Sequence, residues 1–455
     1  MARQSSSQYV PVVTTSHEPA QGRCFRGGNA HWGLSKQHQW LKLSHDLLER
    51  AEAVVSPPEV QTMEATKPLA SGQGLVASFC TSVESTNASD WSRLLPDEAE
   101  DWSYFRTVEA FPPPGFKLGA ILATRGSSLV GAAPVFRASY RFDTSLQATW
   151  RRRIGDLLYA HIPWLVSMDV LSMGSPLSDN SHIGLAPDLS LEERRHVLAE
   201  MLRCLAAHAK KVGVPLIAAK SLNTEEANQL QPVFTSFGYA RVTTIPNVVL
   251  ELPFRDLNDY LSSLAEKTSS YLQRKWRSAS RVSIEYPSSV EGLSCEINAL
   301  YQSTLAQSRV DYGNFGPVHG DYFAAVLRNS PESARIMLCR VDGKLLSFQL
   351  YIVGRNAVHA KGIGMQYPEA REHNLYFLNW KKIMEDCFRC GIPRISMAGT
   401  TYATKLLIGG RLQRRWIFFR FRNDVVNKII PLLAPVFDFE RNDPELRELN
   451  IRNLI

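Results

Sequence analysis

Two apolar hairpins, one in each half of the chain, constrain the fold more than any other feature of the sequence. Residues 118–136 read LGAILATRGSSLVGAAPVF and residues 334–354 read ARIMLCRVDGKLLSFQLYIVG, so strand-length apolar runs flank short turns in both. The Asp-Gly pair at 342–343 is a strong hairpin signal, because both residue types accept the backbone of a tight turn. A helical or turn region precedes each hairpin, and a strand, a helix, a strand and a short helix follow it. This shared element order predicts a duplicated α/β domain.

The expected fold is therefore an α/β protein of two tandem domains, each with a mixed sheet and helices on both faces. We expect the first domain at residues 74–254, the second at residues 255–425 and a tail at 426–455; a length of 455 residues suits this number. Residues 1–73 are rich in Ser, Gln and Thr and contain the breakers SPPE and TKPLASGQG. We expect that segment to be largely disordered, with one amphipathic helix in HQWLKLSHDLLERAEAVV.

Composition limits the compartment and the kind of partner. The start, MARQSSSQYV, lacks the apolar core of a signal peptide, and no apolar run reaches the length of a membrane span. Seven scattered cysteines, an odd number, favour reduced thiols and a cytoplasmic protein. A net charge of +7 is typical of proteins with an anionic partner, such as a phosphate-bearing cofactor or RNA, and also of basic enzymes without one. The oligomeric state is left open.

Common catalytic and metal-binding motifs are missing from the sequence. The pair in CFRC, residues 387–390, has the spacing of a metal or redox site, but no second such pair exists and its flanks read as an apolar helix. No P-loop, HExxH or G-x-S-x-G is present. We therefore predict no metal, and nucleotide-hydrolase, zincin and serine-hydrolase classes lose their usual sequence support.

Three stretches of the second half carry a resemblance to a known family. They are DYLSSLAEKTSSYLQRKWRSAS at 259–280, DGKLLSFQLYIVGRNAVHAKGIGM at 342–365 and CGIPRISMAGTTYATKLLIGG at 390–410. Together they resemble the GNAT superfamily of N-acyltransferases, and within it the double-domain branch of Fem-type and CelD-like acetyltransferases. The resemblance extends over roughly residues 75–425 and is more specific in the second half. It implies two GNAT-like domains, acyl transfer, and an oxyanion held by a backbone N–H where the central strands splay.

The loop that would hold the acyl donor departs from the family pattern. GNAT acetyltransferases carry an R/Q-x-x-G-x-G/A loop, whose backbone N–H groups cradle the pyrophosphate of coenzyme A. Here the loop reads QYPEAREHNLYF, and Arg371, Glu372, His373 and Asn374 stand where glycines are expected. Because Asn adopts the left-handed conformation and caps helices, anion binding at the following helix is retained as a prediction. The cofactor-binding residues implied are Arg371, His373 and Asn374, with acyl-CoA or acetyl-CoA as co-substrate and aminoacyl-tRNA as the alternative.

The segment TTYATKLLIGG contains the sharpest catalytic candidate. A tyrosine-lysine-glycine cluster recurs at this place in the resembled branch, and it falls here on Tyr402, Lys405 and Gly409. Tyr402 and Lys405 are three residues apart and share a helix face. A lysine there could hold a phosphate or carboxylate of a substrate, and the competing interpretation is a solvated lysine on a short helix.

A histidine in the predicted central strand is the third catalytic candidate. His359 in NAVHAKGIG alternates onto one face with Ala357, Lys361 and Ile363. It is a candidate base near the acyl centre, against the alternative of a hydrogen-bonded histidine within the sheet. The resembled branch keeps an acid in the next strand, but this chain has Ser396 and Met397 there, so the general base stays unassigned.

The loop SRVDYGNFGPVHGDYF, residues 308–323, supplies candidate substrate contacts. In the resembled branch this region lies over the acceptor site, which implies Asp311, Tyr312 and His319 as substrate-binding residues. The alternative is a structured loop held by its own aromatic residues.

A basic run closes the helix predicted at the start of the second domain. Arg274, Lys275 and Arg277 flank Trp276 and could bind RNA, or form the outer face of an amphipathic helix with the tryptophan inward.

The sequence thus predicts a soluble N-acyltransferase of the GNAT superfamily. It would transfer an acetyl or longer acyl group from acyl-CoA to an amine of a small molecule or cell-envelope precursor, in biosynthesis. Two alternatives stay open: a FemAB-like transferase that uses aminoacyl-tRNA to form a peptide bond, with tRNA as a partner, and a binding protein without catalysis.

Overall fold

A computed structural model describes residues 74–141, 167–277, 281–307, 318, 320–428 and 438–449. The predicted N-terminal segment lies outside these residues, as does part of the predicted tail. None of the described helices is both long enough and apolar enough to cross a bilayer. The chain from residue 72 onward clusters as one compact unit, which holds both halves of the predicted duplication.

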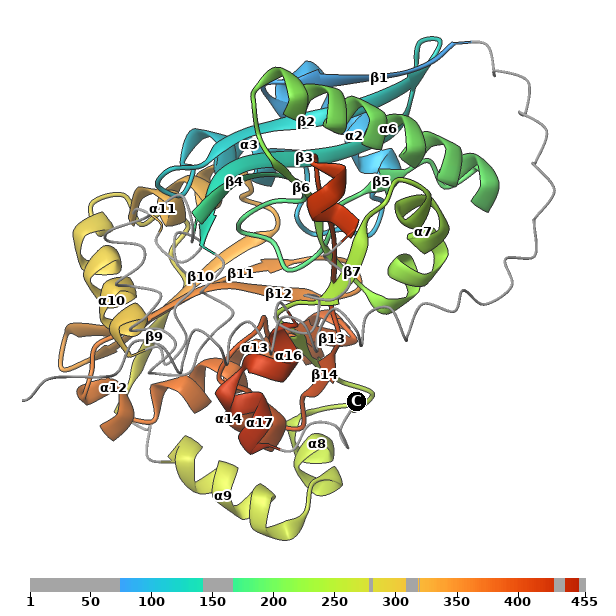
Figure 1. The fold of residues 1–455 in the computed structure, drawn as a ribbon. Coiled ribbons are helices and arrows are strands. Elements are labelled where there is room, and N and C mark those ends of the chain that lie inside the picture. Colours follow the sequence, from blue (N-terminus) through green and yellow to red (C-terminus); the bar gives the residue numbers. More distant parts are fainter. Residues whose placement is uncertain are drawn as a thin grey trace, which may run out of the picture. The chain divides into compact units, whose positions relative to one another are not determined.

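The first of two mixed sheets is built mostly from the first half of the chain (Figure 1). Its strand order is β1-β2-β3-β4-β6-β15-β7, with β5 paired to β3. The strands are β1 (Leu75–Cys80), β2 (Lys117–Arg125), β3 (Ser128–Arg141), β4 (Ser167–Met173), β5 (Gly184–Leu185), β6 (Leu216–Leu222), β7 (Ala240–Thr243) and β15 (Trp416–Phe421). Strands β4 and β6 are parallel, and the other pairs of this sheet are antiparallel.

The second sheet has the order β14-β8-β13-β12-β11-β10-β9. Its strands are β8 (Asn247–Glu251), β9 (Ser283–Glu285), β10 (Ala334–Val341), β11 (Lys344–Val353), β12 (Val358–Met365), β13 (Arg394–Ser396) and β14 (Arg411–Gln413). Within it, β12 and β13 are parallel and the remaining pairs antiparallel. Two mixed sheets of this kind confirm the predicted α/β class.

Two strands lie in the sheet of the other half. β8 comes before residue 254 yet pairs in the second sheet, and β15 follows the second half yet sits between β6 and β7 of the first. The expected second domain, residues 255–425, contains β15, whereas the structure pairs β15 in the first sheet. The domain bounds at 254/255 and 425 stay a prediction, since these two strands cross between the sheets.

The helices begin with α2 (Ala88–Leu94), which follows a short 3-10 turn, η1 (Val83–Ser85), and is followed by α3 (Trp102–Ala110). The longest described helix is α6, which lies across β1 and β2 (Figure 1). Ser190 and Glu193 close a capping box at its start, as expected from their spacing. The described helices after α3 are α6 (Leu191–Lys211), α7 (Thr224–Ser236), α8 (Leu257–Ser263), α9 (Glu266–Arg277), α10 (Ser294–Ala306), α11 (Gly320–Asn329), α12 (Glu369–Glu372), α13 (Leu375–Cys390), α14 (Tyr402–Leu407), α16 (Phe439–Asn442) and α17 (Pro444–Glu448).

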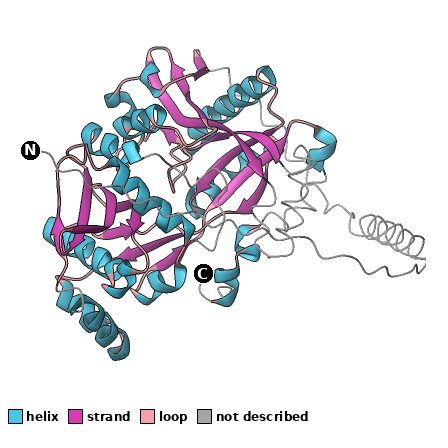
Figure 2. Cartoon of the chain, turned by 90° about the vertical axis from the view of Figure 1, so that its left-hand side faces the viewer, coloured by secondary structure: helices cyan, strands magenta, loops and turns pink. Residues whose placement is uncertain are grey.

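Helices cover both faces of the second sheet (Figure 2). Ile336 and Leu338 of β10 belong to one apolar cluster with α10 and α11, whereas Met337 and Cys339 belong to another with α13. Side chains of successive strand residues alternate between the faces, so this division follows directly from the strand pattern.

The two halves share one apolar core. Residues of α3 and α11 are continuous with the core of both sheets. At this junction Tyr104 and Tyr322 join by their hydroxyls at 3.1 Å, and Asn329 Nδ2 donates to Thr107 Oγ1 at 2.9 Å. Their packing fixes the position of the second sheet relative to the first.

The amphipathic helix predicted at 257–280 is two helices. α8 ends at Ser263 and α9 begins at Glu266, because Leu264 takes an extended backbone (φ −84°, ψ 156°). Trp276 turns inward and donates Nε1 to the carbonyl of Phe377 at 3.1 Å, as the amphipathic interpretation of the basic run expects. The loop predicted at 308–323 is shorter than expected, since α11 begins at Gly320.

Candidate functional site

The neighbouring strands β12 and β13 pair over only a short distance and then part. Their parallel register comprises Val358 with Ile395 and His359 with Ser396, whereas β12 continues to Met365 against β11. Among the described strands, none pairs with this side of β12 beyond His359. The backbone of β12 is therefore open to a ligand on that side, which is the splay implied by the family resemblance.

A bulge sits on β12 where the strands part. Across the β11–β12 ladder Leu350 faces Gly362 and Tyr351 faces Ala360, so Lys361 is an extra residue without a partner. Bulges bend a strand and redirect side chains, and they are common beside functional sites. Here the bulge turns Lys361 toward a cavity that it lines.

The turn after β13 has an unusual backbone. Ala398, Thr400 and Thr401 have φ values of 60°, 67° and 52°, a region that residues with side chains seldom adopt. Such residues cost on the order of 1–3 kcal/mol each and persist where surrounding contacts hold them. Lys405 Nζ supplies those contacts by donating to the carbonyls of Ala398 at 2.9 Å and Gly399 at 2.7 Å.

Lys405 is a buried lysine. It is 4% exposed, and burial lowers its pKa to about 7, although the charges of Asp179 and Glu445 act to raise it. The solvated-lysine interpretation is therefore wrong, because the ammonium contacts backbone carbonyls inside the protein. Its neighbour Tyr402 is also buried on α14. The glycines end that helix, since Gly409 has φ 94° and Gly410 N donates to Lys405 O at 2.9 Å. The catalytic roles of both side chains stay predictions.

A cavity of about 470 Å³ lies beside the parted strands. Ala360 and Lys361 of β12 and Ala398 of the following turn form part of its wall. The first sheet contributes a broad apolar wall from one face of β3, β4, β6, β7 and β15: Phe136, Tyr140, Val170, Leu216, Ala218, Val242, Ile417 and Phe419. The second half adds Tyr301, Leu305, Val318 and Tyr322. Both halves of the chain thus build one cavity.

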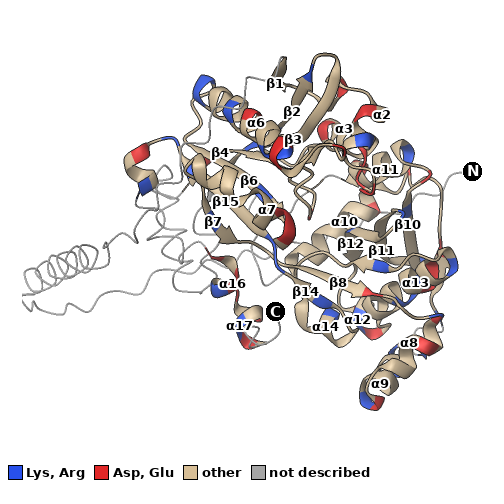
Figure 3. Ribbon diagram, turned by 90° about the vertical axis from the view of Figure 1, so that its right-hand side faces the viewer, with Lys and Arg blue, Asp and Glu red and all other residues tan. Residues whose placement is uncertain are grey.

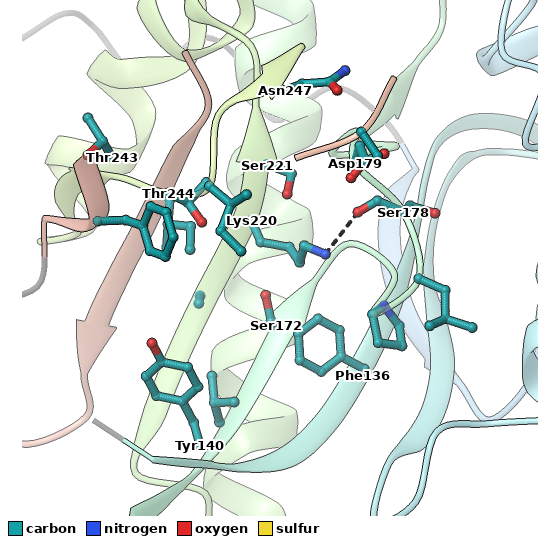
Figure 4. A pocket seen from close by; sticks show the side chains of 18 of the residues that line it. Phe136, Tyr140, Ser172, Ser178, Asp179, Lys220, Ser221, Thr243, Thr244 and Asn247 are labelled. Carbon is teal, nitrogen blue, oxygen red and sulfur yellow. Dashed lines mark hydrogen bonds between the residues drawn. The ribbon is translucent and has the colours of Figure 1, made fainter. Parts of the chain in front are cut away.

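One end of the cavity is polar (Figure 4). Leu216, Ala218 and Lys220 share a face of β6, so the wall changes from apolar to charged along that strand. Lys220 Nζ donates to the carbonyls of Ser175 at 2.7 Å and Ser178 at 2.9 Å. Burial lowers the pKa of Lys220 to about 8, against the opposing charge of Asp179.

Behind the polar end lies a buried cluster of charges from both halves. His182 Nε2 lies 3.4 Å from Glu98 Oε2 and 3.2 Å from Glu100 Oε2. Lys361 Nζ pairs with Glu100 and also donates to the carbonyl of Leu177 at 2.8 Å. The side chains of Glu100 and Lys361 are 1% and 3% exposed, so this ion pair is screened little by water.

The pKa directions show which protonation states the cluster favours. Burial raises the pKa of Glu98, but the charge and hydrogen bond of His182, with smaller contributions from His359 and Asn180, together outweigh burial and lower the pKa to about 2. Burial likewise opposes ionisation of Glu100, yet the charges of Lys361 and His182 lower its pKa overall. Burial lowers the pKa of His182, and the two carboxylates more than reverse this, so its pKa is raised. The cluster therefore consists of charged pairs near neutral pH.

Asn180 extends the cluster to β14 and β15. Its Nδ2 donates to Glu98 at 3.1 Å, and its Oδ1 accepts from the buried Arg415 at 3.0 Å. His359 faces the same carboxylates: burial lowers its pKa, while Glu100 and Glu98 act to raise it. The structure thus brings His359 next to Lys361, the bulge and the charged cluster.

The predicted donor residues lie on the loop between β12 and α13. Arg371 is exposed on α12 and donates to Gln307 at 3.1 Å, and Asn374 precedes α13 in the left-handed conformation (φ 52°) that the sequence predicts for it. His373 lies between the two helices. The predicted substrate contacts Asp311, Tyr312 and His319 lie outside the described residues.

The sequence interpretation missed Asp179, Lys220 and Lys361 as members of the site. Two of them carried a signal, since each lysine is a lone charge in an apolar strand, LIAAKSL and VHAKGIGM. Asp179 follows β4 in a loop, and nothing in the sequence places it beside β12. Within the described residues, no group of His, Cys, Asp and Glu could hold a metal ion.

Solved structures similar to this chain include FemX, a domain of a putative lysylphosphatidylglycerol synthetase and a tandem GNAT protein. The structure of FemX matches with a TM-score of 0.50 at 11% identity, covering 76% of this chain and 98% of FemX. The C-terminal domain of a putative lysylphosphatidylglycerol synthetase from Agrobacterium fabrum matches with a TM-score of 0.46 at 12% identity, over 78% and 98% of the two chains. A tandem GNAT protein from the clavulanic acid biosynthesis pathway has a TM-score of 0.45 at 11% identity, over 76% and 98%.

No protein-family model matches the sequence, and no curated protein matches it. The match covers nearly all of the FemX chain. At 11% sequence identity, it shows a similar fold and nothing about activity. The Fem-like fold predicted from the sequence is thereby confirmed.

Proposed function

We propose that this protein is an N-acyltransferase that moves an acyl group from an acyl-coenzyme A thioester to an amine. The observation that carries the proposal is the parting of β12 from β13 directly beside a cavity built by both halves. Backbone N–H groups on an open strand edge are fixed donors, and such donors stabilise the oxyanion that forms during acyl transfer.

In this reaction the amine nitrogen attacks the thioester carbonyl carbon. A C–N bond forms, the C–S bond breaks, and the one proton that the neutral amine loses leaves with the thiol. An amine that binds as an ammonium ion first releases one further proton to water. The bulge at Lys361 and the turn at Ala398 define the two sides of the gap in which the carbonyl would lie. Lys405 holds that turn through two carbonyls, so it would act on the reaction by positioning the backbone.

Coenzyme A would be held at the loop after β12. Asn374, in the left-handed conformation, precedes α13, and the backbone N–H groups of the first turn of that helix are donors suited to a phosphate. Arg371 on the preceding turn is exposed and adds a positive charge, and His373 lies between them. Together they fit a phosphate-bearing donor, although no glycine eases its approach.

The proposal is tested with purified protein, a series of acyl-coenzyme A donors and a panel of amines. We expect amide products by mass spectrometry and a higher melting temperature with the preferred donor, because a ligand of the native state stabilises it. Lys405→Ala should lower turnover by about 100-fold, the loss typical of a displaced reacting group. Lys210→Ala, at an exposed lysine of α6, is the control. Normal turnover by Lys405→Ala would remove Lys405 from the site.

Aminoacyl-tRNA is the second candidate donor, favoured by the missing glycines at 371–374 and the net charge of +7. Figure 3 shows Lys and Arg interspersed with Asp and Glu along the described elements, and no basic cluster stands out in that view. Ribonuclease treatment of a reconstituted reaction separates the donors: loss of product supports tRNA and an unchanged yield excludes it. Absence of product with every donor supports a binding protein.

A further inference from the structure

The cavity wall contains three charged side chains, which differ in whether the described residues supply them with hydrogen-bond or ion-pair partners. Lys220 already donates to the two carbonyls of Ser175 and Ser178, and Lys361 is paired with Glu100 and Leu177. Asp179 also lines the cavity, and it makes no hydrogen bond or ion pair with any residue that the structure describes. Within the described residues, the two cations of the wall therefore have hydrogen-bond or ion-pair partners, whereas the carboxylate has none.

Asp179 is partly exposed, and its charge reaches the surrounding cations. Burial lowers the pKa of Lys220 and of Lys405, and in both the charge of Asp179 is the largest opposing influence. A carboxylate accepts hydrogen bonds and donates none, so a ligand group that completes it must be a donor. A cationic donor is the stronger partner, because charge-assisted hydrogen bonds exceed neutral ones.

The rest of the wall is suited to an apolar body. Away from Asp179 and Lys220 the cavity follows the face of the first sheet that carries Phe136, Leu216 and Phe419. These residues belong to a separate apolar cluster of that sheet, on the face away from α6. Figure 4 shows Asp179 beyond the tip of Lys220, with Tyr140 toward the other end of the view.

We propose that the cavity binds an amphipathic primary amine. The ammonium group of this amine pairs with Asp179, and its apolar chain lies along the face of β3, β4, β6 and β15 that lines the cavity. Assigning this amine as the acyl acceptor rests on the proposed function. Ala360, Lys361 and Ala398 line the same cavity as Asp179, so the bound nitrogen shares a space with the parted strands. Loss of one proton to water leaves a neutral amine, still donating to Asp179, that can attack.

The test measures binding by calorimetry without any acyl donor. The probes are butylamine, hexylamine and octylamine, with octanol and octanoate as head-group controls. We expect affinity to rise with chain length by about fourfold per methylene, since burial of a methylene group contributes about 0.8 kcal/mol. Octylamine should bind about tenfold to hundredfold more tightly than octanol, the range for a hydrogen bond to a charged group.

Asp179→Asn should abolish the preference for octylamine over octanol and keep the dependence on chain length. Asp188→Asn, at an exposed aspartate nearby in the sequence that does not line the cavity, should bind as the wild type. Three results would overturn the proposal: octanoate binding as tightly as octylamine, an Asp179→Asn variant that still prefers octylamine over octanol, or no binding of any probe.

Addition of acyl-coenzyme A then separates this inference from the proposed function. Amine binding without amide formation by any donor refutes the acyltransferase and leaves the ligand class intact. Acylation of amines with no preference for an apolar chain keeps the acyltransferase and refutes the ligand class.

Discussion

At the scale of single residues, three lysines of the site have in common that each donates a hydrogen bond to the protein backbone. Lys220, Lys361 and Lys405 are each withdrawn from bulk water. Lys220 and Lys405 each donate to two backbone carbonyls, and Lys361 donates to one backbone carbonyl and pairs with Glu100. A lysine with two carbonyl partners joins chain segments that no strand pairing connects. Sequence alone marked Lys405 as unusual because its neighbours are apolar, but its partners depend on a turn whose backbone no sequence pattern discloses.

Lys405→Met tests this clamp. The substitution keeps an unbranched side chain and leaves the carbonyls of Ala398 and Gly399 without their donor, which should cost about 1–3 kcal/mol. Urea unfolding measures the change, and Lys210→Met on the surface of α6 should stay within about 0.5 kcal/mol of the wild type. A fully stable Lys405→Met would show that the turn holds its conformation unaided.

The same pair of proteins predicts a pH dependence. The pKa of Lys405 is about 7 in the folded chain, against 10.5 for an exposed lysine. Between these values the unfolded chain binds more protons than the folded one, so the stability contributed by Lys405 rises with pH. The advantage of the wild type over Lys405→Met should therefore widen from about pH 7 to about pH 9 in unfolding experiments. A gap that stays constant over this range would mean that Lys405 stays protonated in the folded chain.

At the scale of elements, the features that depend on neighbouring residues were predicted from the sequence. Both hairpins and the left-handed Asn374 at the start of α13 follow from residues adjacent in the sequence. The break between α8 and α9 and the bulge at Lys361 were not predicted, since each answers to residues distant along the chain. The pairing of β15 in the first sheet was not predicted for the same reason: its apolar pattern fits either sheet.

The turn of the β10–β11 hairpin allows a clean measurement of one such local determinant. Asp342 and Gly343 both have positive φ, 48° and 79°, and a Cβ at Gly343 would meet no atom within 4 Å. Gly343→Ala should therefore cost about 1 kcal/mol through backbone strain alone. Gly343→Asn should cost less, because Asn tolerates the left-handed region, and equal losses in denaturant unfolding would contradict this explanation.

At the scale of the whole molecule, the buried charges join what the two sheets would otherwise leave separate. Glu98, Glu100 and His182 come from loops of the first half and Lys361 from the second sheet. Such pairs are recorded nowhere in the sequence, because their members lie far apart along it. Residues from both halves also line the cavity, so the site depends on their joint position.

Glu100→Gln tests the importance of this junction. Removing the carboxylate leaves Lys361 and His182 buried with less compensation, which should cost about 3–5 kcal/mol. Glu291→Gln removes a carboxylate from the exposed ion pair with Arg328 and should cost at most about 1 kcal/mol. Both are measured by urea unfolding. The double variant Glu100→Gln with Lys361→Met should recover part of the loss, and no recovery would place the effect outside the ion pair.

The placement of β15 also dictates an order of events during synthesis. A ribosome has made the strands on either side of it, β6 and β7, long before residues 416–421 emerge. Until then the first sheet has a vacancy in its interior, with unpaired edges on both sides that invite association with other chains. The first sheet can therefore be completed only after the last strand of the second half has been synthesised. The cavity, which β15 helps to line, forms late in folding.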